Sequence, residues 1–143
     1  MSPHLEEAWR ALRLADRDIH AFHVLKSDRD THLSVTCFHA QQAVEKSLKA
    51  VLFSRRLEFT RTHNLTELTS LLRRQDLEIP VSDGQLLRLN PYAVTLRYDD
   101  LDVELVKVED MALWVASIRE WAELQVNAAA ITEREDTHIS GNV

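Results

Sequence analysis

The chain has 143 residues, a formal net charge of −6 and a single cysteine, Cys37. This length suits one domain that buries a core without disulfides or metals. A lone cysteine forms no internal disulfide, as expected of a protein in the reducing cytoplasm. The acidic balance disfavours non-specific binding to duplex nucleic acid. The sequence offers neither an apolar run of about 18 residues nor a basic leader, so we expect no membrane association.

The charges are unevenly distributed along the chain. Residues 26–74 carry nine Lys and Arg against five acidic side chains, whereas residues 75–143 carry five against fourteen. The candidate basic patch of the first region consists of Arg55, Arg56, Arg61, Arg73 and Arg74. Such a patch could meet a phosphate or an acidic partner. Alternatively, its members are solvated side chains near helix C-termini, where cations complement the helix dipole.

The first half of the chain predicts two long helices, since few glycines and prolines interrupt it. Ser2 and Pro3 are typical of an N-cap and a first helical position. Apolar residues then recur at three- and four-residue steps and predict a helix to about residue 25. After a polar connection over 26–30, we expect a second helix that ends near Arg56.

Two capping-box patterns predict shorter helices further on. The first runs from Asn64 to Glu67 and opens a helix that carries several leucines. The second runs from Ser82 to Gln85 and starts another leucine-bearing helix. Pro91 then either kinks this helix or begins a new one, because proline cannot donate to a preceding carbonyl.

The remaining residues predict a connection, a long helix and a tail. Residues 99–106 alternate acidic and apolar side chains and predict a connection, with a short extended piece possible. The last helix is expected over residues 107–130. Residues 132–143 are polar without a period, so we expect a disordered tail after a helical domain that covers residues 1–131. The predicted architecture is an all-α, up-and-down antiparallel bundle of four to five helices.

The predicted last helix carries more apolar surface than one bundle contact needs. One stripe consists of Met111, Trp114, Ile118 and Trp121. A second consists of Val108, Ala112, Val115, Ala122 and Val126. Either this helix is buried on two sides of its own bundle, or one stripe pairs with a second copy in a homodimer. The tryptophans favour the homodimer.

The predicted second helix holds the most informative polar side chains. Its polar face carries, within about a turn of one another, His39, Gln42, Glu45, Lys46 and Lys49. The spacing of Glu45 and Lys49 is that of an ordinary surface ion pair. The polar face could therefore simply link neighbouring helices. It could equally hold a phosphate, a base edge or the polar groups of a partner.

Arg97 is the second candidate site residue. Its guanidinium is a planar bidentate donor suited to phosphate, and the neighbouring Tyr98 could stack a base. Alternatively, Arg97 neutralises Asp99 and Asp100 and caps helix carbonyls.

A metal site finds little support in the sequence. Asp16, His20 and His23 share one face of the first predicted helix at ligand-like spacing. Such a face is more often solvated than metal-bound, so we expect neither a metal nor another cofactor.

Three stretches together resemble the HEPN domain family (higher eukaryotes and prokaryotes nucleotide-binding). They are residues 36–52, Thr62-His63-Asn64-Leu65, and Tyr92 to Tyr98. The resemblance extends over most of the chain. It implies a helical bundle that commonly pairs through helices and that handles nucleotides or nucleic acid.

The resemblance is incomplete at the catalytic motif. HEPN ribonucleases carry an Arg that is followed, about four to six residues later, by a His taken as the general acid–base group. Downstream of Arg97 the next His is His138. Arg56 and His63 match the spacing formally, but they lie in a predicted connection and not where the family places its pair. The catalytic candidates are therefore Arg97 and His63, which could substitute from elsewhere in the fold.

The pattern around Arg97 and Tyr98 is closer to small HEPN proteins that pair with a minimal nucleotidyltransferase. That likeness implies an accessory subunit that binds nucleotide or nucleic acid, or a toxin whose partner silences it by modifying a residue such as Tyr98. Two alternatives stay open: a metal-independent ribonuclease toxin that uses Arg97, and a helical adaptor without a ligand. We expect the accessory subunit, homodimeric and cytoplasmic, with its ligand held by the polar face of the second helix together with Arg97 and Tyr98.

Overall fold

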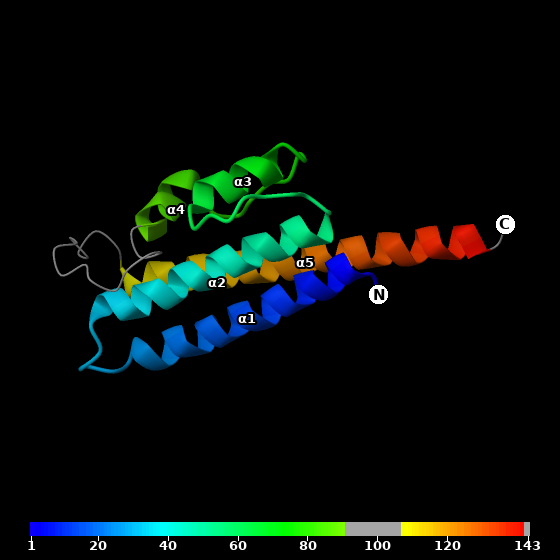
Figure 1. The fold of residues 1–143 in the computed structure, drawn as a ribbon. Coiled ribbons are helices and arrows are strands. Elements are labelled where there is room, and N and C mark those ends of the chain that lie inside the picture. The colour runs from blue at the N-terminus through cyan, green and yellow to red at the C-terminus, as the bar shows by residue number, and fades with distance from the viewer. Residues whose placement is uncertain (91–106, 142–143) are drawn as a thin grey trace.

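The protein is a bundle of helices, described here by a computed structural model that covers residues 1–90 and 107–141, with side chains to residue 137. The helices are α1 (Pro3–Leu25), α2 (Leu33–Ser54), α3 (Leu65–Arg73), α4 (Asp83–Leu89) and α5 (Val108–Gly141) (Figure 1). The described ranges contain no strand, so the predicted all-α class is confirmed. Four predicted features lie outside these ranges: Pro91, Arg97, Tyr98 and the connection over residues 99–106.

Helix α2 is the centre of the bundle. It packs along α1 in an antiparallel pair, α5 packs along both, and α3 and α4 lie on another side of α2 (Figure 1). Helix α5 runs in the same direction as α2, because the chain returns through α3 and α4 before α5 begins. As a result, every residue of α2 is buried or half-buried. Among the described residues, no helix combines the length and the apolar character that a bilayer crossing needs.

The predicted helix ends are confirmed where local signals define them. Helix α1 begins at Pro3 and ends at Leu25. The Ser82 hydroxyl and the Gln85 side chain form the predicted capping box at the start of α4. Helix α2 ends at Ser54, two residues before the predicted end, because Arg56 adopts a left-handed φ of 56° that stops the helix.

Both apolar stripes of α5 pack into the bundle, with Val108, Ala112 and Trp121 half-buried against the core. Met111, Trp114 and Ile118 are at most 8% exposed, and so are residues of the second stripe such as Val115 and Val126. Helix α5 packs against α1 and α2 at once, and two neighbours require a wider apolar face than one. The argument that a stripe was left over for a homodimer is therefore wrong, although the homodimer itself remains a prediction.

Helix α5 is longer than predicted. It continues to Gly141, so the expected end near residue 130 and the disordered tail from residue 132 are corrected. Glutamate and arginine are good helix formers, and no proline or glycine interrupts the segment before Gly141. This part of α5 also lies beside the start of α1, because Met1 and Leu5 line one hollow together with Glu133 and Thr137. The domain boundary at residue 131 remains a prediction.

Candidate functional site

One line of α2 side chains reaches solvent while the rest of the helix is covered. Its half-buried members between the two ends of the helix are Val35, Phe38, His39, Gln42, Lys46, Lys49 and Phe53. They recur at three- and four-residue steps, so they form one strip along the helix. Four of the polar residues predicted for this face, His39, Gln42, Lys46 and Lys49, belong to this strip.

Helix α1 borders the strip and turns it into a groove. A hollow of about 160 Å³ lies between Glu7, Arg10 and Leu14 of α1 and Lys46, Lys49 and Phe53 of α2. A second hollow, of about 650 Å³, shares Lys49 and Phe53 and extends along the segment after α2 to Phe59 and Arg61. We call this continuous depression the α1–α2 groove.

Asp18 contacts one of the side chains that line the groove, Lys46. It projects from the core side of α1 and is 8% exposed. Its two carboxylate oxygens contact different residues of α2: His39 Nδ1 lies 2.9 Å from Oδ1, and Lys46 Nζ donates to Oδ2 at 2.5 Å. The carboxylate therefore fixes an imidazole and an ammonium at the groove while remaining underneath them.

Glu45 of α2 makes a similar pair of contacts, one with an imidazole and one with an ammonium. Its side chain is 4% exposed, with His63 Nδ1 at 2.9 Å from one oxygen and Lys49 Nζ at 3.1 Å from the other. Gln41, fully buried, donates to Glu45 at 3.2 Å and to the backbone carbonyl of His63 at 3.1 Å. Gln42 in turn donates to the Gln41 side chain at 2.7 Å. This network holds the segment before α3 against α2.

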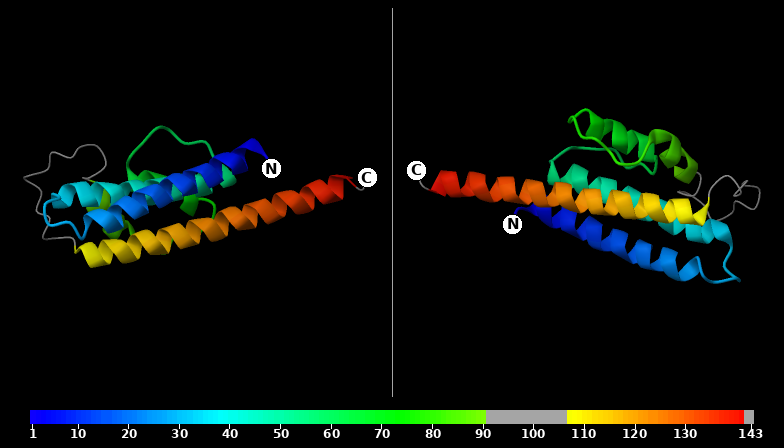
Figure 2. Two further views of the ribbon diagram at one scale, coloured as in Figure 1. Left: turned by 90° about the horizontal axis from the view of Figure 1, so that it is seen from below. Right: turned by 180° about the vertical axis from the view of Figure 1, so that it is seen from behind.

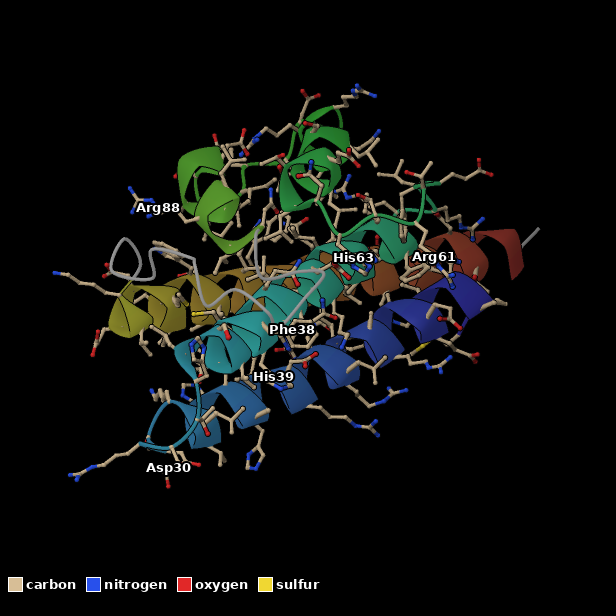
Figure 3. The ribbon with its side chains drawn as sticks, turned by 60° about the vertical axis from the view of Figure 1, so that its left-hand side comes forward. Asp30, Phe38, His39, Arg61, His63 and Arg88 are labelled. Carbon is tan, nitrogen blue, oxygen red and sulfur yellow. The ribbon has the colours of Figure 1, made fainter. Side chains whose placement is uncertain are left out.

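His63 has the geometry of a general acid–base group. Its contact with Glu45 uses Nδ1, and the side chain is 49% exposed, so Nε2 on the opposite side of the ring is available to a ligand. A carboxylate behind an imidazole orients the ring and selects its tautomer. Figure 3 places His39 at the line between α1 and α2, and His63 and Arg61 further along α2 toward its C-terminal end.

An aromatic pair lines the larger hollow. Phe53 and Phe59 meet edge to face, with ring centroids 5.3 Å apart, and both rings are half-buried. Lys49 and Arg61 line the same hollow. Aromatic side chains next to cations suit a ligand that has both bases and phosphates.

The structure corrects one sequence-based expectation about this face. Glu45 is buried beneath the strip, so its contact with Lys49 is not an ordinary surface ion pair. The formal spacing match of Arg56 and His63, which the sequence analysis set aside, brings no shared contact: Arg56 donates to His4 at 3.2 Å, while His63 contacts Glu45.

The predicted basic patch is divided among separate places. Arg61 lines the α1–α2 groove, whereas Arg55 and Arg56 line a different hollow of about 730 Å³ beside α5. Arg73 pairs with Asp83 at 2.6 Å and links α3 to α4. The five arginines therefore do not act as one surface.

Asp16, His20 and His23 do not form a metal site in the structure. The two oxygens of Asp16 accept from Arg119 of α5 at 2.7 and 3.0 Å. Within the described ranges, no group of three or more His, Cys, Asp or Glu side chains could hold a metal ion.

Sequence reasoning missed Asp18 and the two phenylalanines, Phe53 and Phe59. A signal existed for Asp18, which is the one acidic side chain among the buried positions of α1, between Ala15 and Phe22. A buried carboxylate requires a partner. The partner itself could not be named, because it belongs to another helix.

The family of the chain is decided by a match over most of its length. The model of the HEPN domain matches residues 7–125. The chain belongs to the HEPN family. Within this HEPN domain, the matched range includes most of α1, all of α2 to α4 and the first half of α5, and hence the whole α1–α2 groove. A comparison with curated proteins and with solved structures found no significant match.

Proposed function

We propose that this HEPN protein binds a nucleotide or single-stranded RNA along the α1–α2 groove and serves as the accessory subunit of a minimal nucleotidyltransferase. One observation carries the proposal: two buried carboxylates lie beneath a row of ammonium, guanidinium and imidazole groups, and an aromatic pair stands at the end of that row.

The depth of the charges favours an anionic ligand. The Asp18 and Glu45 side chains are 11% and 4% exposed, whereas Lys46 is 30% exposed and Arg61 is exposed. A phosphate that enters the groove therefore meets the cations before the carboxylates. The carboxylates hold the ammonium groups in place, so that less side-chain entropy is lost when a ligand binds.

The first experiment measures binding of a labelled single-stranded RNA by fluorescence anisotropy. Arg61→Gln removes an exposed cation beside Phe59, and we expect affinity to fall about 5- to 10-fold. The plot of log K for RNA association against log salt concentration should become less steep by about 0.7, the value for one lost phosphate contact with a single strand. Arg88→Gln on α4, also exposed, is the matched control (Figure 3). If both variants bind the RNA with equal affinity, the α1–α2 groove is not the RNA-binding site.

The accessory role requires a second measurement. The HEPN protein is co-expressed with a minimal nucleotidyltransferase from the same genome, the product of an adjacent gene where one exists, and the two are passed together over a sizing column. Co-elution at a fixed ratio is expected. Separate elution at micromolar concentration refutes the accessory role. The RNA-binding measurement tests the groove independently of this result.

A ribonuclease is the second candidate, and the Glu45–His63 contact is the observation that favours it. An imidazole held by a buried carboxylate can take the proton of a ribose 2′-hydroxyl without a metal. We expect chelator-insensitive cleavage of transfer RNA by the purified protein, abolished in His63→Ala and in Arg97→Ala. Intact RNA with the wild-type protein would eliminate this candidate.

A further inference from the structure

A polar hollow lies at the end of the bundle where α5 extends past α2. Figures 1 and 2 show α5 continuing beyond the C-terminal end of α2 and past the start of α1. The hollow has a volume of about 730 Å³, within the usual range of small-molecule sites, and we call it the α2–α5 hollow. Among the described residues it shares no lining side chain with the α1–α2 groove. Its charged and amide side chains are Arg55, Arg56, Gln75, Gln125, Glu133 and Asp136.

Two arginines of this hollow contact neutral groups and no carboxylate. Arg56 donates through Nε to His4 Nε2 at 3.2 Å, and Arg55 Nη2 lies 3.5 Å from Gln125 Oε1. An imidazole nitrogen that accepts a hydrogen bond carries no proton, so both partners are uncharged. Arg119 of α5, in contrast, contacts the carboxylate of Asp16 at 2.7 Å. In the described part of the chain no carboxylate pairs with Arg55 or Arg56, so their terminal nitrogens can still donate to an anion.

The backbone at Arg56 indicates that its side chain is not present to end α2. The helix ends in a Schellman motif: the Arg56 N–H donates to the Phe53 carbonyl at 3.0 Å. The Leu57 N–H donates to the Leu52 carbonyl, also at 3.0 Å. Because backbone groups already occupy these carbonyls, no guanidinium is needed to cap them. Arg56 nevertheless stands at the left-handed position, with φ of 56°, where glycine is favoured and a long side chain is strained. Strained residues cluster at functional sites.

We propose that the α2–α5 hollow binds a small phosphate ester with a hydroxylated, non-aromatic body. Phosphate oxygens match the forked guanidinium donors of Arg55 and Arg56. The amides of Gln75 and Gln125 and the hydroxyl of Thr132 can exchange hydrogen bonds with hydroxyl groups of the ligand. No Phe, Tyr or Trp of the described chain lines the hollow, so it lacks the surface on which a nucleobase stacks.

The acidic side chains of α5 limit the charge of the ligand. Glu133 and Asp136 line the same hollow and balance the charges of the two arginines. A polyanion such as RNA therefore gains no net attraction there. A single phosphate can contact the arginines and stay apart from Asp136, which lies 11 residues beyond Gln125, about 16 Å along α5. The ligand of this hollow is thus different from that of the α1–α2 groove, and the proposal does not depend on RNA binding.

Two-dimensional NMR of the ¹⁵N-labelled full-length protein tests the ligand. Glycerol 3-phosphate, titrated at constant ionic strength, should shift the backbone amides of Arg56, Leu57 and Thr132 saturably, with a Kd in the millimolar range. Inorganic phosphate should bind about 3-fold or more weakly, because it has no body to contact the amide and hydroxyl side chains. Shifts no larger than those caused by sodium chloride overturn the site. Equal affinity for inorganic phosphate, or tighter binding of adenosine monophosphate, overturns the ligand class.

Arg56→Gly separates binding from structure, because glycine suits the left-handed backbone and removes the guanidinium. Its melting temperature should equal or exceed that of wild type, whereas its affinity for glycerol 3-phosphate should fall about 10-fold. Its affinity for single-stranded RNA should not change. Arg88→Gln, on α4, is the matched control and should bind the phosphate ester as wild type does. Unchanged phosphate affinity in Arg56→Gly refutes the site, a lower melting temperature refutes the argument from strain, and a parallel loss of RNA affinity refutes a site separate from the groove.

Discussion

Removing the buried Glu45 carboxylate tests the network beneath the α1–α2 groove. In Glu45→Gln the shape of the side chain is kept, but Lys49 loses its counter-charge and His63 loses its anionic acceptor. Lys49 is only 18% exposed, so its ammonium stays largely desolvated after the change. The variant should be clearly less stable than wild type although no apolar contact is lost.

The expected magnitude follows from the burial of the two partners. Breaking a fully buried ion pair from one side costs about 3–5 kcal/mol. Lys49 is partly exposed to solvent and can move outward, and the glutamine still accepts one hydrogen bond. For both reasons we expect a smaller loss in the free energy of unfolding, about 2–3 kcal/mol. That is a large share of a typical stability of about 5–15 kcal/mol. With a urea m-value of about 2 kcal/mol/M, the midpoint should fall by about 1–1.5 M.

Urea unfolding followed by circular dichroism measures this loss. Glu78→Gln, an exposed carboxylate in the loop before α4, is the matched control and should change the midpoint little. Adding Lys49→Met to Glu45→Gln removes the unpaired charge and should recover part of the loss. A loss below about 0.5 kcal/mol with an unchanged m-value would refute the reasoning, because the carboxylate would then contribute no more than a surface charge.

Three further predictions concern the contacts that hold the helices together. Ser82→Ala removes the hydroxyl of the α4 capping box and should reduce the free energy of unfolding, measured in urea, by about 1 kcal/mol. Arg119→Met removes the paired contact with Asp16 that joins α5 to α1; with 17% exposure at Arg119, we expect a loss of about 1–2 kcal/mol by the same measurement. The hydrogen bond from Ser2, aided by nearby positive charge, lowers the pKa of Glu133 below its ordinary value of 4.5, and carboxyl NMR titration should show it. Because folding lowers this pKa, the contact stabilises the fold above pH 4.5 and its contribution is lost as the pH falls through the lowered pKa.

Local patterns predicted most of the helices, since their causes lie within a few residues of sequence. The periodicity after Pro3 defined α1, and the side chains of Ser82 and Gln85 defined the start of α4. The end of α5 was the exception. Its polar residues have no helical period, and the start of α1, beside which this part of α5 lies, belongs to the opposite end of the chain.

The candidate site was predicted in part. His39, Gln42, Lys46 and Lys49 share one strip of α2, as helical spacing requires. The same spacing cannot tell which side of that strip a neighbouring helix will cover. For that reason the burial of Glu45 was not foreseen.

The sequence by itself determined the helical class and the composition of each helix face, because both follow from the 3.6-residue period and from side-chain chemistry. Only the tertiary structure decided which faces meet. It placed Asp18 of α1 under His39 and Lys46, brought His63 to Glu45, and buried both apolar stripes of α5 in its own bundle. These are contacts between residues far apart in the chain, and their geometry depends on how whole helices pack, which no local pattern specifies.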